Sequence, residues 1–116
     1  MGRIALRPIV AQDREAFHAF VKGLSPESRT HRFLAPVREL APAALAALTQ
    51  PDQAQHVGLV AHDGAGIVGE ARYVALGESG RGEFAIAVAD AWQRRGIGAR
   101  LLGDLTAAAP RWPSPS

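Results

Sequence analysis

With 116 residues and no cysteine, the chain has room for one domain and can form neither a disulfide nor a thiolate metal site. Its net charge is +2 and Lys22 is its only lysine, a small positive surplus for a nucleic-acid-binding protein. No apolar run approaches the roughly 18 residues of a membrane-spanning helix, and the first residues lack the apolar run of a secretory signal. We therefore expect a cytoplasmic protein with no membrane segment.

The first half of the chain predicts a strand followed by three helices. From Arg3 to Ile9 polar and apolar residues alternate, which indicates a half-buried strand. The helices are recognised by their starts, because Asp13 and Ser25 are typical caps and Pro42 is favoured in a first turn. We expect these helices over residues 13–24, from 25 to 33 or 34, and over 42–49.

From His56 the hydrophobic period changes to two, which predicts an antiparallel meander of three strands. The first two strands cover residues 56–62 and 67–76, and a polar turn over 78–82 leads to a third over 83–89. Large and small side chains alternate in this third strand, with Phe84, Ile86 and Val88 on one face and alanines on the other. Because the alanine face is nearly bare, a ligand can approach this backbone closely.

A last helix begins near Arg95 or Gly96. We expect its apolar stripe to contain four residues: Ile97, Leu101, Leu102 and Leu105. Prolines stop the helix, so residues 109–116 are interpreted as a Pro/Ser-rich tail behind a domain that spans residues 1–108. Helices combined with an antiparallel meander predict an α+β fold.

The segment from Ile86 to Arg100 carries the chemistry, because it joins a strand to a helix through a basic loop with two glycines. N–H groups at a helix start have no partner inside the helix and lie at the positive end of its dipole. Without side chains at Gly96 and Gly98, a phosphate can reach those groups. The loop therefore predicts a diphosphate site. The alternatives are a tight turn for the glycines and a solvated face for the arginines.

Two common nucleotide motifs do not fit this loop. The dinucleotide fingerprint requires glycine where Leu101 stands, and the Gly-Lys-Ser/Thr of the Walker A loop is absent. The run Gln93-Arg94-Arg95-Gly96-Ile97-Gly98 instead resembles the acetyl-CoA motif of the GNAT superfamily of N-acetyltransferases, Gln/Arg-x-x-Gly-x-Gly/Ala. Shorter runs, among them Arg7-Pro8-Ile9 and Leu24 to Arg29, are similar to the acetyltransferase module of bacterial protein-lysine acetyltransferases. The resemblance covers residues 3–106.

This resemblance implies an acyl-CoA N-acyltransferase (GNAT) fold, with a mainly antiparallel sheet flanked by helices. It also implies acetyl-CoA as cosubstrate, no metal, and an amine as acceptor, either a small molecule or a protein lysine. The diphosphate would lie on the backbone of residues 94–99, and the pantetheine arm would pair with the preceding strand. The expected cofactor-binding residues are Ile86, Ala87, Val88, Gln93, Arg94, Arg95, Gly96, Ile97, Gly98, Ala99 and Arg100.

Glu83 is the candidate catalytic residue. The resemblance places a glutamate base near the start of this strand, where it would take a proton from the amine. An ordinary polar strand start is the alternative reading of Glu83. The remaining chemistry-bearing residues have plainer interpretations: a solvated face rather than an acidic-substrate site for Arg29, Arg32 and Arg38, packing for Trp92, and surface or packing rather than metal ligation for His18, His31, His56 and His62.

The chain also departs from the family pattern, which continues after this helix with a strand, a helix and a hairpin. The tyrosine that often protonates the leaving thiolate has no counterpart, because Tyr73 stands in another element. The strand 83–89 would become an open sheet edge, which predicts a homodimer that covers it. Three hypotheses result: an N-acetyltransferase, a non-catalytic acyl-CoA-binding or regulatory remnant, and, least favoured, a nucleic-acid-binding module.

Overall fold

The computed structural model describes residues 3–33, 40–75 and 82–108. Their centre is one four-stranded antiparallel sheet whose strands follow chain order, β1-β2-β3-β4. The strands are β1 (Ala5–Pro8), β2 (His56–His62), β3 (Ile67–Ala75) and β4 (Gly82–Val88). The predicted meander is confirmed, with strand ends that match or shift by one residue. Leu76 and residues 78–81 of the predicted second turn lie outside the described residues.

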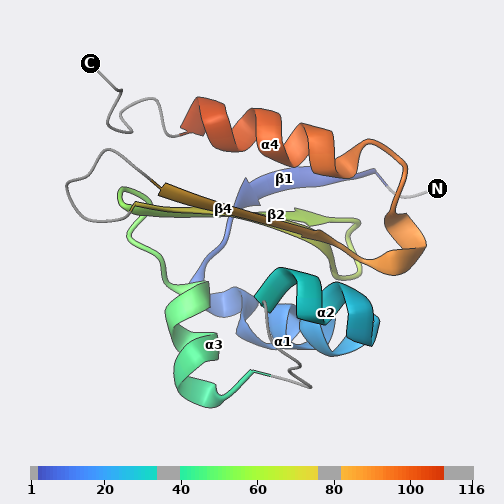
Figure 1. Ribbon diagram of the computed structural model, residues 1–116, viewed down its shortest axis with the longest axis horizontal. Coiled ribbons are helices and arrows are strands. Elements are labelled where there is room, and N and C mark those ends of the chain that lie inside the picture. Colours follow the sequence, from blue (N-terminus) through green and yellow to red (C-terminus); the bar gives the residue numbers. More distant parts are fainter. Residues whose placement is uncertain (1–2, 34–39, 76–81, 109–116) are drawn as a thin grey trace.

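The helices cover both faces of the sheet (Figure 1). They are α1 (Arg14–Gly23), α2 (Pro26–Phe33), α3 (Pro42–Thr49) and α4 (Ile97–Ala108). Helix α4 lies along one face, while α1, α2 and α3 lie against the other. The predicted helix starts are confirmed at Ser25, whose Oγ accepts the N–H of Ser28 at 3.1 Å, and at Pro42. No helix in the described ranges is both long and apolar enough to cross a membrane.

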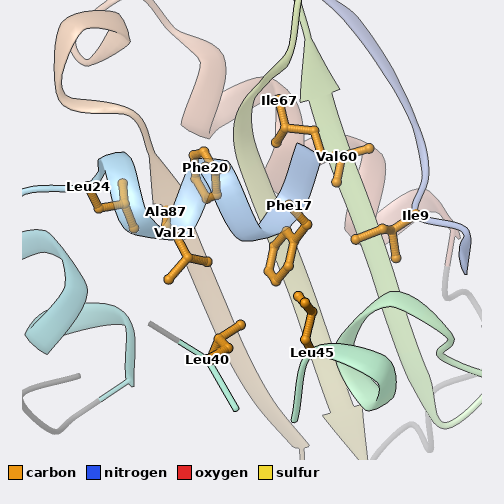
Figure 2. Packing of buried hydrophobic residues seen from close by; sticks show 10 residues of the cluster. All are labelled: Ile9, Phe17, Phe20, Val21, Leu24, Leu40, Leu45, Val60, Ile67 and Ala87. Carbon is orange, nitrogen blue, oxygen red and sulfur yellow. The ribbon is translucent and has the colours of Figure 1, made fainter. Parts of the chain in front are cut away.

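Each face of the sheet has its own apolar core. Beneath the sheet, side chains of α1 and α3 meet those of the strands, as Figure 2 shows. This cluster comprises Ile9, Phe17, Phe20, Val21, Leu24, Leu40, Leu45, Val60, Ile67 and Ala87. The second cluster joins the opposite face to α4: Val57, Leu59, Ala61, Val68, Ala71, Tyr73, Ile97, Leu101 and Leu105. The two clusters together fix the sheet between its helical layers.

The role expected of Asp13 at the start of α1 is wrong. Asp13 stands in the N-cap position, but its carboxylate makes no capping hydrogen bond to that helix. It instead accepts two hydrogen bonds from the guanidinium of Arg7, both 2.7 Å long, and one from the N–H of Val10. The Arg7 hydrogen bond, aided by that N–H, lowers the pKa of Asp13. The carboxylate thus ties β1 to the turn that precedes α1.

The apolar stripe predicted for α4 is wrong at one position. Ile97, Leu101 and Leu105 recur every four residues and are buried, whereas the side chain of Leu102 is 42% exposed. At about 100° per residue, Ile97, Leu101 and Leu105 span an arc of about 80° around the helix axis, and Leu102 lies about 60° beyond the edge of that arc. It lies instead at the flank of the helix.

Candidate functional site

One edge of β4 presents its main chain away from the sheet. The N–H of Ala89 donates to the carbonyl of Val68 on the β3 side, and groups that face the same side recur at every second residue. The peptide groups of Ala87 therefore face β3, while those of Ile86 and Val88 face outward. In the described part of the chain, β3 is the only strand that pairs with β4. The outward peptide groups can accordingly bind an extended ligand as a further strand would.

This edge leads directly into the start of α4. The side-chain amide of Gln93 donates to the outward carbonyl of Val88 at 3.1 Å, so the loop folds back over the end of the strand. In α4, the N–H of Arg100 donates to the carbonyl of Gly96 at 3.1 Å. The three preceding N–H groups, of residues 97–99, come before the first hydrogen bond of the helix. Their positive ends can hold an anion.

Gly96 and Gly98 differ in what their positions require: Gly96 has a left-handed backbone, whereas Gly98 does not. Gly96 has φ +80° and Arg94 has φ +64°, both in the left-handed region. A backbone that changes hand at successive residues forms a concavity lined by N–H groups, which favours anions. A Cβ at Gly98, by contrast, would make ordinary contacts of 3.9 and 4.0 Å with Val88 and Ile86. Helix–strand packing therefore does not require glycine at position 98.

The three arginines around the start of α4 have different surroundings. Arg95 stacks over the ring of Trp92 at 5.0 Å, and Trp92 packs against the core beside α4, as its packing interpretation predicted. Arg100 reaches the carbonyl of Ile4 at 3.4 Å, so its side chain connects α4 to the residues before β1. Arg94 is exposed. Arg94 and Arg95 are thus the arginine side chains that remain beside the opening of α4.

Helix α2 is held beside β4 by the turn Asp90–Trp92. The carboxylate of Asp90 accepts the N–H of Ser25 at 3.1 Å and the hydroxyl of Ser28 at 3.4 Å. These hydrogen bonds, chiefly that from Ser25, lower the pKa of Asp90. A negatively charged group beside the first turn of a helix also interacts favourably with the helix dipole. The position of α2 relative to the strand edge is therefore set at this end by one carboxylate.

Two hollows follow β4 on the side of α2. The first, of about 340 Å³, lies next to the loop and is lined by Glu27, Ser28, His31, Arg32, Ile86, Ala87, Val88 and Gln93. The second, of about 380 Å³, lies toward the start of the strand and is lined by His31, Arg32, Leu48, His56, Arg72, Val74, Glu83, Phe84, Ala85 and Ile86. They share three residues, so together they follow the strand from the loop to Glu83.

Beneath the second hollow, a buried carboxylate joins α2 to the sheet. Glu70 is fully buried and accepts hydrogen bonds from Arg32 of α2 and from Nε of Arg72, the latter at 2.7 Å. Burial alone would raise the pKa of Glu70, but the two guanidinium charges outweigh it and lower that pKa. The solvated role expected of Arg32 is therefore wrong, because its guanidinium reaches a carboxylate hidden in the sheet. Arg38 lies outside the described residues.

His56 completes this buried group. Its Nε2 lies 3.1 Å from Nη1 of Arg72, which also donates to the carbonyl of Leu48 at 2.5 Å. An arginine can only donate, so Nε2 must accept and the ring is neutral in this arrangement. Desolvation and the nearby Arg72 charge lower the pKa of His56. The described residues contain no group of His and carboxylate side chains arranged to hold a metal ion.

Comparison with known sequences decides the family. Residues 54–113, about half of the chain, match the family described as Acetyltransferase (GNAT) domain. The chain belongs to the GNAT family. It is 37% identical over 112 residues to an acetyltransferase of Pseudomonas aeruginosa, a match that covers 93% of this chain and 60% of the relative. The chain thus spans less than two thirds of that relative's length.

Solved GNAT structures confirm the predicted α+β fold. The GNAT domain of S. lividans PAT superposes with a TM-score of 0.86 at 32% identity, over 93% of this chain and 66% of that one. A cAMP-binding acyltransferase from Mycobacterium smegmatis matches with a TM-score of 0.60 at 31% identity, over 95% of this chain and 32% of its own length. Membership of the GNAT family implies an acyl-CoA cosubstrate. The free amides and the concave loop at α4 fit its diphosphate.

Glu83 lies at the rim of the second hollow in this GNAT chain. It follows the first residue of β4, is exposed, and shares a sheet face with Ala85 and Ala87. The predicted alternation of β4 is confirmed: Phe84 and Ile86 on the opposite face are 49% and 36% exposed, while Ala87 is buried. The buried group around Glu70 was not predicted. Its sequence signal was two charged residues, Glu70 and Arg72, in the middle of an otherwise apolar strand.

Replacement of Glu70 by Gln should destabilise the protein by about 3–5 kcal/mol, because two buried guanidinium groups lose their counter-charge. The matched control is Glu15→Gln on the exposed face of α1, which should change stability by less than about 0.5 kcal/mol. Urea unfolding at pH 7 measures both effects.

The same pair of proteins gives a pH test. The pKa of Glu70 in the folded state lies below its ordinary value of 4.5. The charged carboxylate therefore stabilises the fold above pH 4.5, and this stabilisation is lost as the pH falls from 4.5 through the lowered pKa. The difference in the free energy of unfolding between wild type and Glu70→Gln should therefore become smaller at acid pH. A gap that stays constant from pH 7 to pH 3 would contradict a charged, paired Glu70.

Proposed function

We propose that this GNAT chain binds acetyl-CoA and transfers its acetyl group to an amine. The observation that carries this proposal is the continuity between the outward edge of β4 and the free amides at the start of α4. Together they form one run of main-chain donors and acceptors. Pantetheine carries amide groups and the diphosphate carries negative charge, so the two halves of this run match two successive parts of one ligand.

The proposed cofactor contacts are divided between the loop and the strand. The diphosphate lies on the N–H groups of residues 94–99, and Arg94 and Arg95 add positive charge at its side. The pantetheine arm follows the first hollow, where Ile86 and Val88 present outward peptide groups and Gln93 closes the end of the edge. Ala87 also lines this hollow. Arg100 holds α4 in place through its hydrogen bond to the carbonyl of Ile4.

In the proposed reaction, Glu83 takes a proton from the acceptor amine, directly or through water. The bound cosubstrate supplies an acetyl thioester. The outward N–H of Ile86 is directed to the side on which the thioester oxygen gains negative charge, and it stabilises that charge. A C–N bond forms, the C–S bond breaks, and the thiolate takes up a proton from solvent.

A second candidate, acyl-CoA binding without turnover, is supported by the position of Tyr73. This only tyrosine of the sequence is buried beneath α4, with its ring 5.0 Å from that of Phe84. Its phenol therefore cannot protonate a thiolate on the β4 edge. The phenol of Tyr73 is thus not the proton donor to the leaving thiolate, and binding without turnover stays the second candidate.

The similarity to bacterial protein-lysine acetyltransferases and to S. lividans PAT supports a protein lysine as one acceptor. A cytoplasmic location and a homodimer that covers β4 stay predictions. The exposed side chains of Phe84 and Ile86 would lie in such a contact, and a dimer that also covered the outward peptide groups of β4 would compete with the pantetheine arm.

Replacement of Gly98 by Glu should lower the affinity for acetyl-CoA by at least about 100-fold, because a carboxylate would stand among the amides that hold the diphosphate. Gly98→Ala is the matched control: its Cβ makes only ordinary contacts and carries no charge, so binding should change little. Calorimetric titration with acetyl-CoA measures both. Equal affinity in the two variants would place the diphosphate elsewhere.

Replacement of Glu83 by Gln should lower kcat by about 100-fold or more while the affinity for acetyl-CoA stays unchanged, since Glu83 acts on the acceptor. Steady-state acetylation of polyamine, aminoglycoside and lysine-peptide panels measures the rate. Asp104→Asn on the exposed surface of α4 is the control. Acetyl-CoA binding with no turnover by the wild type would favour the second candidate, and full activity in Glu83→Gln would remove Glu83 from the mechanism.

A further inference from the structure

We propose that the acceptor carries a carboxylate near its amine, and that Arg32 and Arg72 bind this carboxylate in the second hollow. The inference rests on the proposed function, because it names the class of acceptor for the same site. It is carried by the buried charges under the hollow and by the donors that those charges leave unused.

The charges under the hollow do not balance. Within residues 3–33, 40–75 and 82–108, Glu70 is the one carboxylate that pairs with Arg32 and Arg72, so two positive charges share one negative charge. The side chains of Arg32 and Arg72 are only 9% and 3% exposed. A buried charge without a partner is costly, and a second carboxylate would remove that cost.

The two guanidinium groups also retain unused donors. Arginine has five N–H bonds. Arg32 directs Nε and Nη2 to Glu70, and Arg72 directs Nε to Glu70 and Nη1 to Leu48 and His56. Among the residues that the structure describes, Nη1 of Arg32 and Nη2 of Arg72 have no acceptor. Both side chains line the second hollow, where an entering carboxylate can accept from them.

The other ionisable groups that line the hollow do not occupy the unused donors of Arg32 and Arg72 in the described structure. His56 is neutral, because its Nε2 accepts from Arg72. Glu83 and His31 are exposed at the rim, and no ion pair joins Glu83 to either arginine in the described structure. An acceptor with its carboxylate at the arginines can therefore extend toward Glu83 and the strand edge. The apolar walls, Leu48, Val74 and Phe84, suit a short methylene chain between the two groups.

Binding of matched probes tests this inference directly. The probes are 5-aminopentanoate and its neutral amide, 5-aminopentanamide, titrated into the full chain and followed by amide chemical shifts. Because a hydrogen bond to a charged group is worth more than one to a neutral group, the acid should bind at least about tenfold more tightly. Equal affinities for acid and amide would overturn the proposal. This comparison uses only the wild-type protein, so it does not depend on the folding of any variant.

A pair of variants locates the carboxylate. Ala85 stands directly opposite Arg72 and lines the hollow, so a longer side chain there reaches the guanidinium groups. Ala85→Glu should supply the missing carboxylate from within and abolish the preference for the acid. Ala85→Gln, equal in size and uncharged, should retain that preference. A preference that survives in Ala85→Glu would place the acid outside this hollow and overturn the assignment.

Two further arms separate the remaining possibilities. Blocked lysine peptides with Glu or Gln beside the lysine extend the comparison from free amino acids to a protein acceptor. Tighter binding of the Glu peptide identifies a protein as the source of the carboxylate, whereas a preference seen only with 5-aminopentanoate identifies a free amino acid. Coenzyme A is titrated separately. Coenzyme A binding at α4 without any carboxylate preference overturns this inference and leaves the proposed function standing, whereas no coenzyme A binding removes the proposed function itself.

Discussion

The outward edge of β4 is the constraint on which the site depends. Backbone N–H and C=O groups need partners, and in a sheet those partners are normally other strands. Here the peptide groups of Ile86 and Val88 face away from β3, and Gln93 bonds only the carbonyl at the end of the edge. Because the chain then turns into α4, the edge meets the unpaired amides of that helix. A ligand with amides followed by a diphosphate satisfies both sets of groups.

The second constraint is the contact between α2 and the sheet. The carboxylate of Asp90 fixes one end of the helix and the carboxylate of Glu70 fixes the other, through Arg32. The hollows that follow β4 exist because these two contacts hold α2 beside the strand. The same buried arginines that position the helix also leave positive charge facing the place where an acceptor would lie. In the proposed binding mode, one group of side chains therefore combines structural support with substrate selection.

The local features of the fold could be predicted from the sequence, because they depend on neighbouring residues. Ser25 and Pro42 mark helix starts, and the alternation from His56 onward marks the meander. The loop 93–98 could be identified because its glycines and its motif are contiguous. The pairing of Arg32 with Glu70 could not be predicted, because it joins residues 38 positions apart and depends on the packing of α2. The role of Asp13 could not be predicted for a different reason: Arg7, six positions earlier, competes with the helix for its carboxylate, and a capping pattern does not indicate which of the two partners it binds.

The central claim is that the edge of β4 and the first amides of α4 form one binding surface for acyl-CoA. Titration of the ¹⁵N-labelled chain with coenzyme A tests it most directly. The account predicts that the amide signals of Ile86, Val88, Ile97, Gly98 and Ala99 shift together along a single binding curve, while those of β1 stay in place. Shifts confined to another surface, or separate curves for the strand and the helix, would contradict it.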